Sequence, residues 1–192
     1  VLFAPNDWAY NNLKEMKLKG TLFNLSANTN VDSLSYALSR NEPPSFSIDN
    51  YCLFAVHRVE NLYNRSRLAK IVELIKRIST GKHVLFILHP PTERQLKKCG
   101  LYEKVSGFSG VMLSALLPHK DFVSFLRGAD FVVTDGGSVQ EECFYLNIPC
   151  LLMRKKTERP EGLGENVCLS EFDDDKINGF LEDFRRFKCK NP

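Results

Sequence analysis

No apolar run in this 192-residue sequence approaches the roughly 20 residues that a membrane-spanning helix requires, so we expect no membrane partner. Residues 1–5, VLFAP, lack the charged start and the long apolar region of a secretory signal peptide, which favours a cytoplasmic protein. A strong excess of positive charge is also missing, since 26 basic residues stand against 23 acidic ones. This balance argues against a nucleic-acid partner held by a basic face.

The six cysteines lack the close pairing of many metal and redox sites, because no two of them have C-x-x-C spacing. Cys52, Cys143 and Cys150 lie in or beside apolar segments. We therefore predict buried free thiols in a reducing compartment rather than a disulfide framework. No zinc site, other metal site or cofactor is expected.

The sequence does contain a regular alternation of short apolar segments with amphipathic ones. Nearly continuous apolar segments predict strands at 51–57, 83–89, 110–114, 130–135, 148–154 and 166–170, and a further strand is predicted at 21–27. Helices are predicted at 29–40, 121–129 and 173–187, and along the face that Leu68, Ile71, Val72, Ile75 and Ile78 share. Buried strands alternating with helices indicate a Rossmann-like α/β fold, a doubly wound parallel sheet covered on both faces.

Polar residues follow several of these strands, at the edge where such sheets bind ligands. His57 and Arg58 end one strand and His89 ends the next. Asp135 leads into Gly136, Gly137 and Ser138 after another strand, and a basic segment that includes Arg159 follows the strand at 148–154. A lone histidine at a strand end is usually structural, but several such ends together favour a site.

The DGGS turn is the most informative of these strand ends. Two glycines remove Cβ atoms where a ligand would approach the backbone, although a tight turn alone could also require them. Ser138 is predicted to cap the following helix, whose free N–H groups suit a phosphate. Glu141 and Glu142 are predicted in its first turn, where either could favour the helix dipole or accept hydrogen bonds from ribose hydroxyls.

Five segments together resemble the carboxyl-terminal half of UDP-N-acetylglucosamine 2-epimerases. They are NTNVD (28–32), HRVEN (57–61), TDGGSVQEE (134–142), IPCLLMR (148–154) and TERPEGLGEN (157–166). The resemblance implies a GT-B-type two-domain protein with the nucleotide sugar between its domains. It also implies a division into residues 1–45, the end of the amino-terminal half with the connection, and residues 46–192, a UDP-sugar-binding domain.

The resemblance assigns roles by position. It implies His57 as a catalytic residue beside the substrate, Gly136–Ser138 at the β-phosphate, and Glu142 at the ribose. The other implied substrate-binding residues are Arg58, Glu60, Asn61, Phe122 at the uracil, Gln140, and Arg159 at the diphosphate. Two motifs depart from the family pattern: the common Asp-Ser-Gly-Gly turn is Asp135-Gly136-Gly137-Ser138 here, and His-x-Asn-Pro is replaced by His89-Pro90-Pro91.

The implied reaction is elimination of UDP from UDP-N-acetylglucosamine, followed by epimerisation at C2. The family carboxylates that transfer the C2 proton belong to the half that this sequence does not contain, so we expect the chain alone to bind UDP-sugars without catalysing. The intact protein is expected to be a homodimer in polysaccharide biosynthesis. Two alternatives stay open, namely the donor domain of a GT-B glycosyltransferase, against which TERPEGLGEN argues, and a non-catalytic UDP-sugar-binding module.

Overall fold

The computed structural model describes residues 1–40, 43 and 46–189, and divides into two compact units, Val1–Arg40 and Asn41–Pro192. The predicted boundary between residues 45 and 46 falls beside residues outside the described set and stays a prediction. In the described part of the chain, no helix combines the length and the apolar character that crossing a bilayer demands. The two units are described separately below.

The first unit is a small β-α-β-α arrangement. It comprises β1 (Leu2–Ala4), α1 (Asp7–Glu15), β2 (Leu22–Asn24) and α2 (Thr29–Arg40). β1 and β2 pair in parallel, with Leu2 opposite Leu22. Helix α2 has the predicted bounds, whereas the predicted strand 21–27 is only three residues long.

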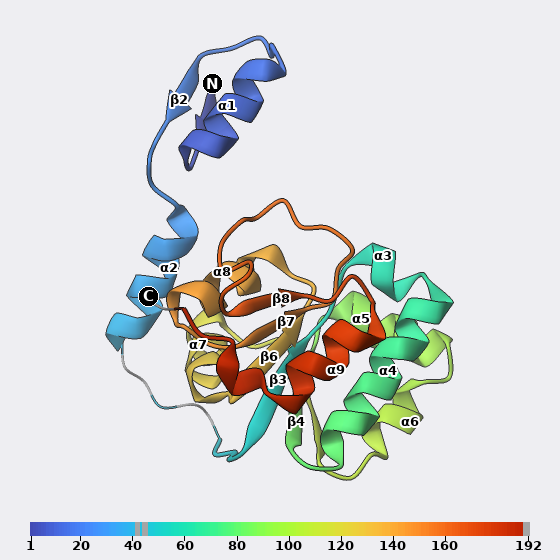
Figure 1. Ribbon diagram of the computed structural model, residues 1–192. Coiled ribbons are helices and arrows are strands. Elements are labelled where there is room, and N and C mark those ends of the chain that lie inside the picture. The colour runs from blue at the N-terminus through green and yellow to red at the C-terminus, as the bar shows by residue number, and fades with distance from the viewer. Residues whose placement is uncertain (41–42, 44–45, 190–192) are drawn as a thin grey trace. The chain divides into compact units, whose positions relative to one another are not determined.

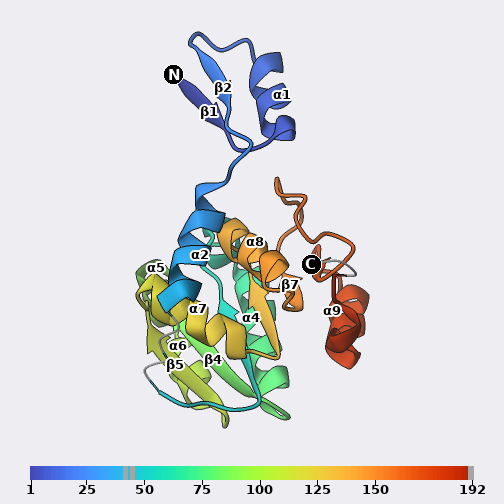
Figure 2. The same cartoon turned by 90° about the vertical axis from the view of Figure 1, so that its left-hand side faces the viewer.

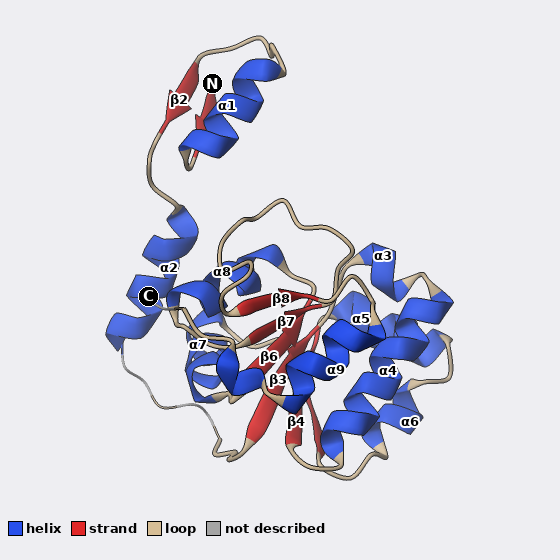
Figure 3. Ribbon diagram, in the orientation of Figure 1, coloured by secondary structure: helices blue, strands red, loops and turns tan. Residues whose placement is uncertain are grey.

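The second unit is built on a six-stranded sheet, which confirms the predicted fold class (Figure 1). Its strands are β3 (Tyr51–Ala55), β4 (His83–Leu88), β5 (Val111–Ala115), β6 (Phe131–Thr134), β7 (Cys150–Leu152) and β8 (Val167–Leu169). They are all parallel and lie in the order β5-β4-β3-β6-β7-β8. Figure 3 shows these strands enclosed between helices.

Successive strand residues point to opposite faces of the sheet, so both faces carry apolar side chains and helices cover each of them. Cys52 and Phe54 join the core beneath α3 (Val59–Leu62), α4 (Arg65–Ser79), α5 (Pro90–Lys98), α6 (Tyr102–Ser106) and α9 (Asp174–Glu182). Leu53 and Ala55 join the opposite core beneath α7 (His119–Gly128) and α8 (Gly137–Tyr145). Figure 2 shows α7 and α8 together, apart from α9.

Buried thiols belong to both cores. Cys52 contributes to the first, and Cys143 and Cys150 contribute to the second. All three are fully buried, and all six cysteines are free, in agreement with the prediction.

Among the segments that differ from the sequence prediction are residues 90–98 and 173–187. Residues 90–98 were not predicted as a helix, but they form α5, with Pro90 in its first turn, where a missing N–H is harmless. The helix predicted over 173–187 ends at Glu182, because Asp183 leaves helical geometry with φ −146° and ψ 64°. Its residues 184–186 form a separate 3-10 helix, η1 (Phe184–Arg186).

The strand order places a topological switch point between β3 and β6. From β3 the chain continues through α3 and α4 on one face, and from β6 it continues through α8 on the other. Connections that diverge in this way leave a crevice at the carboxyl ends of the two strands, which is where open α/β sheets bind ligands. The segments that follow β3 and β6 are the two that the sequence marks with His57 and the glycine turn.

Candidate functional site

One carboxylate joins the two loops at the switch point. Asp135, fully buried at the end of β6, accepts hydrogen bonds from the backbone N–H groups of His57 (2.9 Å) and Arg58 (3.0 Å). It also accepts one from the side chain of Asn61 (2.8 Å), which donates in addition to the Met153 carbonyl at 2.9 Å. Asp135 therefore fixes the backbone that carries His57.

The glycine turn brings two side chains close to the backbone at the start of α8. Neither glycine has a positive φ, so steric room accounts for both better than backbone freedom does. A Cβ on Gly136 would lie 3.0 Å from Cε1 of His57, and a Cβ on Gly137 would lie 2.5 Å from Nε of Arg159. The turn thus lets an imidazole and a guanidinium approach the N-terminus of a helix.

Two details of this turn correct the sequence prediction. The N-cap of α8 is Gly136 rather than Ser138, which is the second residue of the helix. Glu141 and Glu142 fall beyond the first turn of α8, so neither carboxylate lies at the helix start. The first turn of α8 therefore contains no carboxylate of its own, although Oε1 of Glu158 lies 3.4 Å from where a Cβ on Gly137 would stand.

A cavity of about 350 Å³ opens beside the glycine turn. Its walls come from the carboxyl ends of β3, β4, β5 and β6 and from α7 and α8. The lining residues are His57, His89, Leu116, Leu117, His119, Phe122, Gly136, Gly137, Ser138, Val139 and Glu142. A mainly apolar wall with a few convergent polar groups is typical of small-molecule sites.

Two histidines form one polar group in this wall. The rings of His57 and His89 are stacked, with centroids 4.4 Å apart and planes 22° apart. Burial lowers the pKa of His89, and the neighbouring His57 lowers it further. His57 Nδ1 is buried without a hydrogen-bond partner among the described residues, at 3.5 Å from the Asp135 carboxylate.

A carboxylate and a third histidine form the other polar group. Glu142 is buried, and its Oε1 lies 2.8 Å from Nε2 of His119. Burial raises the pKa of Glu142, and the hydrogen bond and charge of His119 oppose that rise. Phe122 lies one turn after His119 in α7 and faces the same cavity.

The remaining sequence-predicted residues lie outside the cavity lining. Arg58 pairs with Glu60 at 3.0 Å on the exposed rim, and Asn61 binds Asp135 as described above. Gln140 is fully buried and holds the segment 157–161: its amide N–H₂ donates to the carbonyls of Arg159 and Glu161 (3.0 Å each), and its oxygen accepts from Thr157 at 2.8 Å.

Arg159 is held at the edge of the glycine turn. Its guanidinium forms an ion pair with the buried Glu141, while its Nε is buried and finds no hydrogen-bond partner in the part of the chain that the structure describes. Because a buried N–H without a partner is costly, this atom is available to an acceptor that reaches the turn.

Sequence reasoning missed several members of the cavity. His89 was noted at a strand end but given no role, and His119 was not considered at all. The three-residue spacing of His119 and Phe122 on one helix face was the available signal for His119. Over residues 1–40, 43 and 46–189, no three His, Cys, Asp or Glu side chains are grouped to hold a metal ion.

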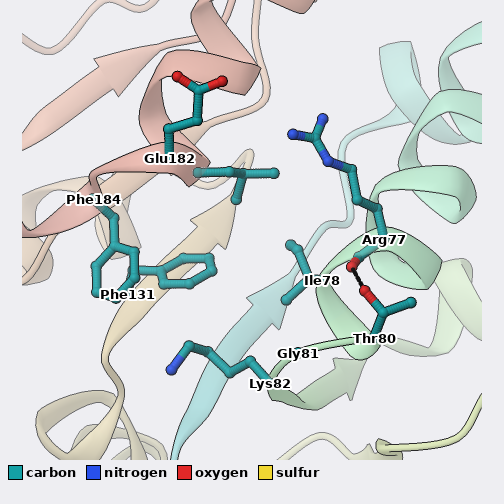
Figure 4. A pocket seen from close by; sticks show the side chains of 9 residues that line it. Arg77, Ile78, Thr80, Gly81, Lys82, Phe131, Glu182 and Phe184 are labelled. Carbon is teal, nitrogen blue, oxygen red and sulfur yellow. Dashed lines mark hydrogen bonds between the residues drawn. The ribbon is translucent and has the colours of Figure 1, made fainter.

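A second hollow, of about 340 Å³, lies at the other end of the strands from this cavity (Figure 4). Arg77, Lys82, Phe131 and Phe184 are among its lining residues. Its cations already have partners, because Lys82 contacts Asp130 and Arg77 contacts Asn178. It also lies at the amino ends of the strands, where this type of sheet does not bind its ligands. We therefore take the cavity at the switch point as the candidate site.

Comparison with known proteins identifies the family. Residues 1–190 match the sequence profile of the family described as UDP-N-acetylglucosamine 2-epimerase. The chain belongs to this family. A UDP-N-acetylglucosamine 2-epimerase of Methanocaldococcus jannaschii is 33% identical over 183 residues, which cover 88% of this chain and 50% of the relative. One from Methanococcus maripaludis is 32% identical over 176 residues, which cover 86% and 48%.

A solved epimerase structure extends this match to the fold. The crystal structure of the M. jannaschii UDP-GlcNAc 2-epimerase in complex with UDP-GlcNAc and UDP has a TM-score of 0.87 and 31% sequence identity. The match covers 100% of this chain and 55% of that one. The predicted GT-B-type class is confirmed. The chain spans about half the length of the curated relatives it matches, a share consistent with the predicted carboxyl-terminal half of an epimerase.

The role of Asp135 generates a stability prediction. Replacing Asp135 by Asn keeps the shape but turns an N–H₂ group toward backbone donors, so we expect the free energy of unfolding to fall by about 2–3 kcal/mol. Urea unfolding measures this change. The matched control is Asp174→Asn in the exposed pair with Lys70, for which we expect a loss under about 1 kcal/mol. Equal unfolding midpoints for the two variants would contradict the bridging role.

Proposed function

We propose that this chain is the UDP-sugar-binding half of a UDP-N-acetylglucosamine 2-epimerase, and that the cavity at the switch point receives the nucleotide. The observation that carries the proposal is the cavity itself, in which a glycine turn, a helix N-terminus and polar side chains meet at the β3–β6 crevice of an epimerase-family chain. The M. jannaschii relative, whose structure holds UDP-GlcNAc and UDP, supports the choice of ligand.

The diphosphate is assigned to the start of α8. Gly136, Gly137 and Ser138 form the start of this helix, where its dipole favours negative charge, and the N–H of Gly136 itself donates to Oγ1 of Thr134 at 3.0 Å. Arg159 and His57 flank the two glycines closely enough that a Cβ on either would crowd them. Each also has a buried nitrogen without a hydrogen-bond partner in the described structure, although carboxylates lie 3.5 Å from Nδ1 of His57 and 4.0 Å from Nε of Arg159. Arg58 directly follows His57 and is assigned to the same diphosphate, with its charge partly offset by the ion pair with Glu60.

The nucleoside is assigned to the α7 side of the cavity. Phe122 offers an aromatic face to the uracil, and Glu142 accepts hydrogen bonds from the ribose hydroxyls. Gln140 and Asn61 act indirectly, since one holds the 157–161 segment and the other holds Asp135. Glu60 acts through its pair with Arg58. This division gives every predicted residue either a direct or a supporting role.

The chemical role of this half is stabilisation of the leaving group. Elimination breaks the bond between C1 and the diphosphate oxygen while a base takes the C2 proton, which gives UDP and a 2-acetamidoglucal. His57 is assigned to the diphosphate, where a hydrogen bond to the developing charge strengthens as that bond breaks. The carboxylates that move the C2 proton are assigned to the amino-terminal half. A homodimeric, cytoplasmic enzyme of polysaccharide biosynthesis remains the prediction for the intact protein.

Binding of UDP tests the diphosphate assignment. We expect the 192-residue chain to bind UDP at least about tenfold more tightly than uridine, because charge-assisted hydrogen bonds to phosphate contribute roughly 1.5–3 kcal/mol each. Isothermal titration calorimetry with both ligands gives the two affinities. Equal affinities would remove the diphosphate from the glycine turn.

A substitution in the turn localises that binding. Gly137→Ala places a Cβ only 2.5 Å from Nε of Arg159 and must displace that side chain, so we expect UDP affinity to fall about tenfold or more while uridine affinity changes little. Gly81→Ala is the matched control, because a Cβ there meets no atom within 4 Å. The assignment fails if both variants bind UDP as the unmodified chain does.

The division of labour between the halves generates a separate prediction. We expect the chain alone to leave the C2 proton of UDP-N-acetylglucosamine in place, since a base must lie within hydrogen-bond reach of it. Nuclear magnetic resonance in heavy water measures deuterium incorporation at C2. Incorporation above that of an enzyme-free sample would show that the proton-transferring group lies within these residues.

A further inference from the structure

His119 is one of the cavity residues that the assigned roles leave without a function. It opens α7 and extends into the cavity, where its side chain is 40% exposed. Its Nε2 lies 2.8 Å from the Glu142 carboxylate, whose side chain is only 4% exposed. The accessible imidazole of His119 thus contacts Glu142, the one carboxylate among the residues that line the cavity.

We propose that His119 is a positioning residue that holds the Glu142 carboxylate toward the vicinal hydroxyls of a ribose, and thereby sets a preference for ribonucleotides over 2′-deoxyribonucleotides. The proposal rests on the proposed function, since it assumes that the nucleoside of UDP lies between Phe122 and Glu142. His119 acts through Glu142 and does not itself bind the ribose.

The geometry supports this role in two ways. His119 and Phe122 are one turn apart on the same helix and line the same cavity, so the group that orients Glu142 and the ring assigned to the base are held by one rigid element. The contact also engages Oε1 of Glu142 at 2.8 Å, which restricts the carboxylate to one orientation.

Protonation of Glu142 explains why its partner matters. An ionised carboxylate accepts hydrogen bonds at both oxygens, whereas a protonated one loses part of that capacity. Burial raises the pKa of Glu142 and His119 lowers it, so removing His119 leaves only the upward influences. Recognition of the diol is lost as the pH falls through the pKa of Glu142, and without His119 this loss occurs at higher pH.

Other ionisable groups surround the pair and must be separated from it. They are His57 and His89 across the cavity, Glu141 beside Glu142, and Lys120 and Asp121 beside His119 in α7. The phosphates of the ligand titrate as well. A ratio of two affinities removes these shared contributions, because UDP and 2′-deoxy-UDP carry the same diphosphate and the same base.

The experiment therefore measures the ratio of the dissociation constants of 2′-deoxy-UDP and UDP for the 192-residue chain, at about pH 6 and about pH 8.5. For the unmodified chain we expect a ratio of roughly ten or more at both pH values, because 2′-deoxy-UDP lacks the hydroxyl that donates a hydrogen bond to the charged Glu142 carboxylate. For His119→Ala the ratio is expected to fall below about three at the lower pH and to recover in part at the higher.

Two further variants separate positioning from general structural damage. His119→Gln retains an N–H donor without the imidazole charge, so its ratio is expected to match the unmodified chain at high pH and to fall at low pH. His83→Ala is the control histidine, exposed at the opposite edge of the sheet, and its ratio is expected to be unchanged. Circular dichroism melts establish that each variant is folded.

The outcomes are distinguishable. If His119→Ala keeps the unmodified ratio at both pH values, or weakens UDP and 2′-deoxy-UDP equally, the positioning role is overturned. If the unmodified chain binds UDP but does not discriminate against the deoxy ligand, the ribose assignment of Glu142 fails and the inference with it. If the unmodified chain binds neither ligand, it is the proposed function itself that fails.

Discussion

The carboxylate of Asp135 is the contact on which the arrangement of the candidate site depends. The loops after β3 and β6 leave the sheet toward opposite faces, and no covalent bond fixes their relative position. The buried side chain of Asp135 joins them by accepting hydrogen bonds from His57, Arg58 and Asn61. A buried carboxylate must have such partners, so the same atoms satisfy Asp135 and fix the loop. The crevice is thereby given a defined shape before any ligand is considered.

Much of the fold was predictable because its strongest signal is local. Segments such as YCLFAVH and HVLFIL are apolar on both faces, a pattern that only a covered parallel sheet explains well, and they became β3 and β4. No helix was predicted over 90–98, although a helix tolerates the prolines that stand in its first turn. The early end of α9 at Asp183 depends on backbone angles that the charge pattern of the segment did not reveal.

The sequence predicted at which edge of the sheet the candidate site lies, but not which residues contact one another there. The strand-end rule brought His57, Gly136 and Gly137 to one place, and the structure shows them there. It could not distinguish residues that face the cavity from residues that support it. Gln140 and Glu142 are two positions apart in α8, yet one holds a loop and the other lines the cavity. Contacts between distant segments decide such roles, and the proximity of His119 to Glu142 is one of them.

Burial acts on the two polar groups of the cavity in opposite directions. It lowers the pKa of His89 and raises the pKa of Glu142, so in each case it favours the neutral form. A wall that disfavours charge on its own side chains has a low effective dielectric constant, which strengthens the interaction between its dipoles and a charged ligand. Gly136 fits this environment, since a Cβ there would lie only 3.0 Å from Cε1 of the His57 ring.

The bonding of Gln140 bears on how tightly any ligand can be held. Its amide bonds to Thr157, Arg159 and Glu161 at once, so the segment that carries the guanidinium is ordered by contacts within the protein itself. The segment therefore loses its conformational entropy when the protein folds, and ligand binding does not have to order it. A change at Gln140 would loosen the segment from a position outside the cavity lining. Recognition at this edge is in that sense preorganised from inside α8.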